Sequence, residues 1–163
     1  MTETRKFYTG VGSRNTPKSI IDLMTAVAKK LEGNGFTLRS GGALGADQAF
    51  ESGTTQAAIY KAEHTTPAAM KIAAQFHPVW HKCSEYARKL HGRNTFQVLG
   101  GKLNNPSTFL MCWTQDGCVT HATRTIKTGG TGTAISIADY YNVPIFNLGR
   151  PAHLSKVKGW LTD

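Results

Sequence analysis

The chain has 163 residues, of which 40% are hydrophobic and 18% are charged. This size is typical of one soluble domain, and no apolar run approaches the roughly 18 residues that a membrane-spanning helix needs. No apolar signal core follows the first residues, so we expect a cytoplasmic protein rather than an exported or membrane-bound one. The formal net charge of +9 at pH 7 predicts an anionic partner, either a polymer or a small phosphate ester.

Short apolar or β-branched segments alternate with helical patterns along the chain. Strands are predicted at residues 7–11, 36–39, 57–60, 108–113 and 143–148. Helices are predicted from Thr16-Pro17 to Gly33 and over about 45–52. Two more are predicted within residues 66–101, one beginning at Pro67 and the other at Pro78. The last two are predicted from about residue 133 to Tyr141 and over about 152–161. This alternation predicts a single Rossmann-like α/β domain over residues 1–163. Its mainly parallel five-strand sheet, in the order 3-2-1-4-5, would have helices on both faces.

Glycine-rich loops follow the predicted strands one, two and four. They are residues 10–14 (GVGSR), 40–47 (SGGALGAD) and 129–133 (GGTGT), and they hold eight of the 17 glycines, two in the first loop and three in each of the others. Glycine permits close backbone approach, and the helix after each loop would direct free N–H groups at an anion. Since strands two, one and four are neighbours in this order, the loops are predicted to converge at the carboxyl edge of the sheet.

The predicted ligand-binding residues come from these loops and from the turn after strand four. They are Gly12, Ser13, Arg14, Ser40, Gly41, Gly42, Ala43, Asp47, Thr114, Asp116, Gly129, Gly130, Thr131, Gly132 and Thr133. Ser13 and Arg14 are suited to clamp a phosphate, and Thr114 and Asp116 to reach a ribose or base. Asp116-Gly117 is equally typical of a plain turn.

Three carboxylates are candidates for catalysis, although no catalytic set is defined. Asp47 either stabilises the first turn of its helix or binds a ribose hydroxyl or the neighbouring loop amides. Glu51 lies one turn later and either is solvated or flanks a sugar. Asp116 is the third candidate.

The basic middle of the chain is predicted to be helical and to be either a solvated surface or a nucleic-acid contact. The candidates for nucleic acid are Lys82, Arg88, Lys89 and Arg93. Arg93-Asn94, at the end of the basic helix, is predicted to reach the pocket rim or a nucleic-acid backbone, or to be exposed surface. No metal is expected. The three cysteines, Cys83, Cys112 and Cys118, lack metal-type pairing, and no second ligand pair accompanies His81-Lys82-Cys83.

The three glycine-rich segments, taken together, resemble the SLOG superfamily. This superfamily joins the Rossmann domain of DNA-processing protein A (DprA) to the LOG-type nucleotide phosphoribohydrolases. The resemblance is carried by residues 10–14, 38–47 and 129–133, and the "RN" and "CWT-x-DG" motifs are similar to those of small stand-alone DprA-like proteins of bacteriophages. It implies a Rossmann-like fold, binding of a nucleotide or of single-stranded DNA, and a homodimer or other homo-oligomer, in the host cytoplasm if the protein is viral.

Two departures from the family pattern separate the functional hypotheses. LOG-type enzymes follow their glycine loop with acidic residues, but this chain has Ala134, Ile135 and Ser136 there, and Thr128 in place of the proline. The resemblance also covers only the Rossmann domain of DprA, so we do not expect its flanking domains. We therefore expect a binding protein for a nucleotide-derived phosphate ligand, with no required cofactor. The alternatives are a DprA-like single-stranded DNA-binding recombination mediator and a LOG-type N-glycosidic hydrolase.

Overall fold

A parallel five-stranded sheet forms the centre of the molecule in a computed structural model that describes residues 6–162. The strands are β1 (Lys6–Gly10), β2 (Phe36–Ser40), β3 (Ala57–Ile59), β4 (Leu110–Cys112) and β5 (Ile145–Asn147). Their spatial order is β3-β2-β1-β4-β5, with Tyr8 beside Leu38 and Met111 beside Phe146. The predicted fold class and strand order are confirmed. β4 and β5 pair over fewer residues than their apolar runs suggested.

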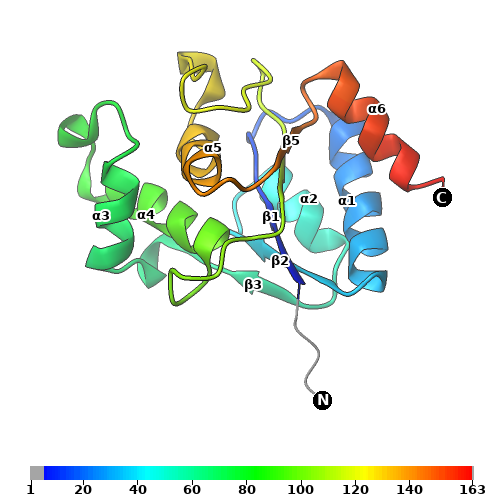
Figure 1. The fold of residues 1–163 in the computed structure, drawn as a ribbon, viewed down its shortest axis with the longest axis horizontal. Helices are drawn as coiled ribbons and strands as arrows, with labels where there is room; N and C mark the ends of the chain where they lie inside the picture. The colour runs from blue at the N-terminus through cyan, green and yellow to red at the C-terminus, as the bar shows by residue number, and fades with distance from the viewer. Residues whose placement is uncertain (1–5, 163) are drawn as a thin grey trace.

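Helices cover both faces of this sheet (Figure 1). One face carries α1 (Lys18–Gly33), α2 (Ala46–Ser52) and α6 (Pro151–Trp160). The other carries α3 (Pro67–Ala74), α4 (Glu85–Leu99) and α5 (Thr131–Tyr140). Short 3-10 helices η1 (Ala62–His64), η2 (Trp80–Lys82) and η3 (Ile126–Thr128) lie in the connections. None of the helices within residues 6–162 combines the length and the apolar character that crossing a membrane requires.

Each face of the sheet has its own apolar core. Tyr8, Phe50 and Phe109 pack with α1 and α2 on one side, whereas Leu110 and Ile135 pack with α4 and α5 on the other. β4 contributes to both cores, and its three residues are fully buried. This two-sided burial explains why the β4 segment is the most apolar run in the sequence.

Buried polar contacts fix the second half of α4 against the sheet. The Arg39 guanidinium donates from Nη1 to the carbonyl oxygens of Val98 (3.2 Å) and Asn105 (2.7 Å). The Thr9 hydroxyl donates to the carbonyl oxygen of Gln97 at 2.6 Å. These contacts set the rotation of α4 about its axis, so they determine which of its side chains face the carboxyl edge of the sheet.

Two helix starts differ from the prediction. The second basic helix begins at Glu85 rather than at Pro78, because the Ser84 hydroxyl caps it by accepting from the Ala87 N–H at 3.1 Å. α1 begins at Lys18, and Thr16 does not cap it. The Thr16 hydroxyl donates instead to the carbonyl oxygen of Ser13 at 2.6 Å, which ties the first glycine-rich loop to the helix that follows.

Candidate functional site

A cavity of about 850 Å³ opens at the carboxyl edge of the sheet, beside the point where the strand order reverses between β1 and β4. It is lined by residues 11–15 after β1, by Ala43 and Asp47 of the second loop and α2, by Ala87, Leu90, His91, Arg93, Asn94 and Gln97 of α4, by Trp113 and Gln115 after β4, and by residues 126–131. All three glycine-rich loops therefore contribute to one cavity, together with a wall from α4.

The first loop is held in place by backbone contacts and leaves its arginine exposed on the cavity rim. The Ser13 N–H donates to the carbonyl oxygen of Trp113 at 3.2 Å, and the Ser13 hydroxyl accepts from the Asn15 N–H at 2.9 Å. Gly12, Ser13 and Arg14 all line the cavity. The Arg14 guanidinium makes no hydrogen bond to the described residues, so it is available to an anion.

The first and second loops touch through Gly45. This residue has φ +87°, and a Cβ atom added there would lie 2.7 Å from the Ser13 carbonyl oxygen and 2.8 Å from the Arg14 Cα. Only glycine allows both this backbone conformation and this approach. The contact sets the position of the first loop relative to the start of α2.

The second loop binds carboxylates of the protein itself. Asp47 Oδ2 accepts from the N–H groups of Gly41 (3.1 Å) and Ala43 (3.4 Å). Glu51 Oε2 accepts from the Gly42 N–H (3.0 Å) and the Ser40 hydroxyl (2.6 Å). Of the residues predicted here, Ala43 and Asp47 line the cavity, whereas Ser40, Gly41 and Gly42 do not. Internal carboxylates therefore occupy the amide cradle that the sequence suggested for a ligand phosphate.

Asp47 carries an unusual carboxyl group. Its side chain is nearly buried, and burial raises its pKa to about 6, although the Arg93 charge and the loop amides act in the opposite direction. It is also the one carboxylate among the described residues that line the cavity. Of the three predicted catalytic candidates, Asp47 alone faces a space that a ligand could enter.

The third loop is open toward the cavity. Gly129, Gly130 and Thr131 line it, and a Cβ atom added at Gly129 or Gly130 would have no neighbour within 4 Å. Within residues 6–162, no acceptor contacts the N–H groups of Gly130 and Thr131, which begin α5. These amides and the helix dipole create a positive local potential at the cavity wall.

The other two predicted residues of the third loop serve its packing. A Cβ atom added at Gly132 would lie 2.5 Å from the Nε of Arg124, so this glycine makes room for the arginine. The Thr133 hydroxyl is fully buried and lies 3.0 Å from Nδ1 of His91. Thr133 thereby links the start of α5 to α4.

Thr114 and Asp116 do not line the cavity. The Asp116 carboxylate accepts from the hydroxyls of Thr114 (2.8 Å), Thr125 (2.7 Å) and Thr128, and from the Cys118 N–H at 3.2 Å. Burial acts to raise the pKa of Asp116, but the hydroxyl hydrogen bonds outweigh it and lower the pKa below its ordinary value. Asp116 thus anchors η3, which precedes the third loop, and the predicted contact with ribose or base has no geometric support.

The wall from α4 includes Arg93 and Asn94, for which the pocket rim was one predicted alternative, and Gln97, which the sequence did not mark. Gln97 is fully buried and lines the cavity, yet neither atom of its side-chain amide has a partner among the described residues. Arg93 donates from Nη1 to the Gly41 carbonyl oxygen at 3.0 Å, while its buried Nε is unpaired in the same region. Buried polar atoms are normally paired. The available signal in the sequence was a group of polar residues, Arg93, Asn94 and Gln97, within one turn of the same predicted helix.

The predicted nucleic-acid residues are largely engaged within the protein. Arg88 donates from Nε to the Trp80 carbonyl oxygen at 3.2 Å and lies over the Trp80 ring. Lys89 lies 3.8 Å from Glu85, and Arg93 faces the cavity. Lys82 is exposed. These four cations therefore do not form one free basic strip.

No protein-family model, curated protein or solved structure matches this chain. Function is therefore inferred from the cavity itself.

Proposed function

We propose that the protein binds a nucleotide or a nucleotide-derived phosphate compound in this cavity. The observation that carries the proposal is the start of α5, where the Gly130 and Thr131 amides face the cavity without an acceptor in the described chain. A phosphate would satisfy these donors and interact favourably with the helix dipole. The cavity volume of about 850 Å³ lies within the range of roughly 300–1,000 Å³ that is usual for small-molecule sites.

The arrangement of charges supports one position for the phosphate. Arg14 and Lys127 are exposed and line the same cavity, and Lys127 lies two residues before the third loop. The second loop is less suitable, because the Asp47 and Glu51 carboxylates already occupy its amides. We therefore place the phosphate between the third loop and Arg14.

The floor of the cavity suits the uncharged part of a nucleotide. Gln97 lines the cavity, and its unpaired amide has one acceptor oxygen and a donor NH₂ group, which would match the edge of a base after a side-chain movement that uncovers them. Asp47 can accept from a ribose hydroxyl. These groups come from α4 and α2, so their separation from the third loop is set by the packing of the helices on the sheet.

Binding of three probes tests this assignment: adenosine 5′-monophosphate, adenosine and inorganic phosphate, measured by calorimetry. The monophosphate should bind more tightly than either of its parts. Gly130→Val should weaken binding by about tenfold or more, equivalent to about 1.4 kcal/mol, because its side chain would extend into the cavity. Gly159→Val is the matched control, since Gly159 also has no neighbour within 4 Å but lies in α6.

Full affinity of Gly130→Val, with a native melting curve, would contradict this assignment. Mass spectrometry of small molecules released from the purified, denatured protein would identify a co-purified ligand directly. Added salt distinguishes the polymer alternative. For binding to a nucleic-acid backbone, the logarithm of the binding constant falls with the logarithm of the salt concentration, with a slope of about −1 for each phosphate that the protein neutralises. Release of free base from nucleoside monophosphates would favour the hydrolase alternative, with Asp47 as the carboxylate in reach.

A further inference from the structure

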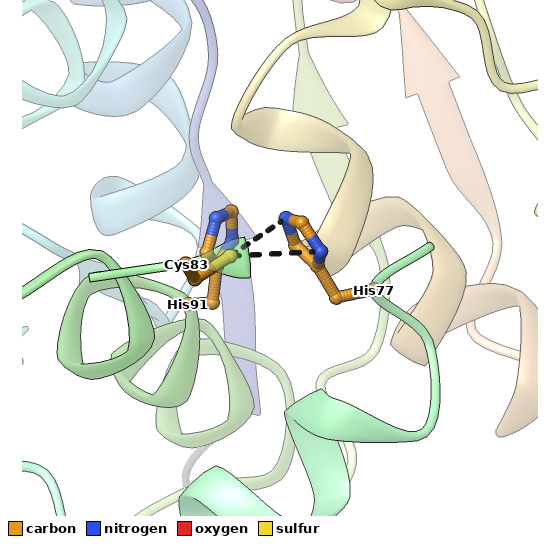
Figure 2. Close-up of side chains that lie close together, drawn as sticks. All are labelled: His77, Cys83 and His91. Atoms are coloured by element: carbon orange, nitrogen blue, oxygen red, sulfur yellow. Dashed lines mark hydrogen bonds between the residues drawn. The ribbon is translucent and has the colours of Figure 1, made fainter. Parts of the chain in front are cut away.

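Two histidines and a cysteine from different segments lie close together beside α4 (Figure 2). His77 follows α3, Cys83 precedes α4, and His91 lies on α4 itself. Cys83 Sγ lies 3.8 Å from Nδ1 and 3.7 Å from Nε2 of His77, and the rings of His77 and His91 have centroids 4.4 Å apart. One ligand atom from each of the three residues can be chosen so that all lie within 4.8 Å of one another.

These separations approach those in a tetrahedral zinc site. With Zn–S of about 2.3 Å and Zn–N of about 2.05 Å, tetrahedral angles place sulfur and nitrogen about 3.6 Å apart and two nitrogens about 3.3 Å apart. The observed sulfur–nitrogen distances of 3.7 and 3.8 Å are close to the first value. We propose that His77, Cys83 and His91 bind a Zn²⁺ ion, with water or an exogenous donor at the fourth position.

The surroundings of His91 favour this role. Its Nδ1 lies 3.0 Å from the buried Thr133 hydroxyl, which leaves Nε2 for the metal. A hydrogen-bonding partner on the second ring nitrogen is the usual way in which proteins orient a ligating histidine. His91 also lines the cavity, so the ion would lie at the cavity wall.

Binding would change the protonation of two ligands. The Cys83 thiol would release its proton to solvent as the sulfur–zinc bond forms, so binding would strengthen as the pH rises. Nδ1 of His77 now accepts from the Val79 N–H at 3.1 Å. That hydrogen bond would break, because Nδ1 must then hold either the metal or the ring proton.

The segment that carries His77 and Cys83 has little other means of attachment. No residue from 74 to 91 is fully buried. Arg124 and Arg88 hold this segment through the carbonyl oxygens of Phe76 (2.7 Å) and Trp80 (3.2 Å). An ion bound by His77, Cys83 and His91 would attach this segment to α4 through His91. The site has one thiolate and lies near Arg124, so we expect weaker affinity than at sites with two thiolates.

Metal binding by the untagged full chain tests the proposal without reference to any nucleotide. After removal of metal with a chelator, the protein should take up about one Zn²⁺ per chain. Co²⁺ should give intense tetrahedral d–d bands and a thiolate-to-cobalt charge-transfer band. Cys83→Ser should abolish the charge-transfer band. Thr133→Val removes only the hydroxyl that orients His91 and should lower the zinc affinity about tenfold to hundredfold. His77→Ala and His91→Ala each remove a ligand and should lower the zinc affinity by at least as much.

His81→Ala is the matched control, because His81 is an exposed histidine of the same segment and lies outside the cluster. Its metal affinity should equal that of the wild type. A readout on the unaltered chain is protection of Cys83 from alkylation by Zn²⁺, located by peptide mass spectrometry. Absence of both protection and the charge-transfer band would overturn the proposal and leave a metal-free hydrogen-bonded cluster. Equal binding by Cys83→Ser and the wild type would do the same.

Discussion

Replacing Gln97 by leucine should stabilise the protein while weakening ligand binding. The side chain is fully buried, and both polar atoms of its amide lack partners in the described chain. An unpaired buried polar group costs about 1–3 kcal/mol. Leucine has a similar size and no polar atoms, so we expect the free energy of unfolding to rise by about 1–3 kcal/mol. A buried polar group without a partner calls for an explanation, and a binding site provides one.

Asn147→Leu provides the matched comparison, because Asn147 is also a fully buried amide but is completely paired. Its Nδ2 donates to the Thr114 hydroxyl (2.7 Å) and to the Cys118 carbonyl oxygen (2.8 Å). Its Oδ1 accepts from the N–H groups of Thr114 (3.2 Å) and Gly149 (2.9 Å). Leucine would leave these groups unpaired, at a cost of about 2–5 kcal/mol.

Urea denaturation followed by tryptophan fluorescence measures both variants against the wild type. The two substitutions should move the transition midpoint in opposite directions. A loss of more than about 1 kcal/mol in Gln97→Leu would show that the amide is paired in solution and would remove the basis for the prediction. Calorimetry with adenosine 5′-monophosphate should show weaker binding by Gln97→Leu even though it is the more stable protein.

Two further variants address the loops that form the cavity. Gly45→Ala should lower the free energy of unfolding by about 2–4 kcal/mol, because the φ of +87° and the 2.7 Å approach to the Ser13 carbonyl oxygen both exclude a side chain. A change below about 0.5 kcal/mol in urea denaturation would contradict this contact. Asp47→Asn should alter the dependence of stability on pH. Since the folded pKa of about 6 is above the ordinary value of 3.8, the stability linked to protonated Asp47 is complete below about pH 4 and is lost as the pH rises through 6. The wild type should therefore lose about 2.4 kcal/mol relative to Asp47→Asn between pH 4 and pH 7, and parallel profiles from urea titrations would count against a raised pKa.

The topology followed from local patterns in the sequence, whereas the contents of the cavity did not. Strand–helix alternation and the handedness of crossover connections predicted the strand order and the convergence of the three loops. One predicted alternative, that Asp47 binds the neighbouring loop amides, is confirmed. The pattern did not show that Glu51 also binds these amides, because that depends on its side chain, one turn later on α2, reaching back to the loop.

Gln97 of the α4 wall was missed for a related reason, whereas Arg93 and Asn94 line the cavity as one of the predicted alternatives had it. The start of α4 was predicted at Pro78, and the contacts that set its rotation come from Arg39 and Thr9, far away in the sequence. Local periodicity therefore could not show that Gln97 faces the cavity. The cluster of His77, Cys83 and His91 was missed because its ligands are spaced by six and eight residues rather than as adjacent pairs.

Because the Asp47 and Glu51 carboxylates bind the second-loop amides, the two ends of the cavity differ in electrostatic potential. Unpaired amide donors and the Lys127 side chain lie toward the α5 end, and the Asp47 carboxyl group lies at the α2 end. A molecule with one charged terminus would therefore enter in a single orientation, whereas one with phosphates at both termini would bring an anion against Asp47. The protein should thus discriminate between monophosphorylated compounds and their bisphosphorylated analogues through repulsion rather than through size.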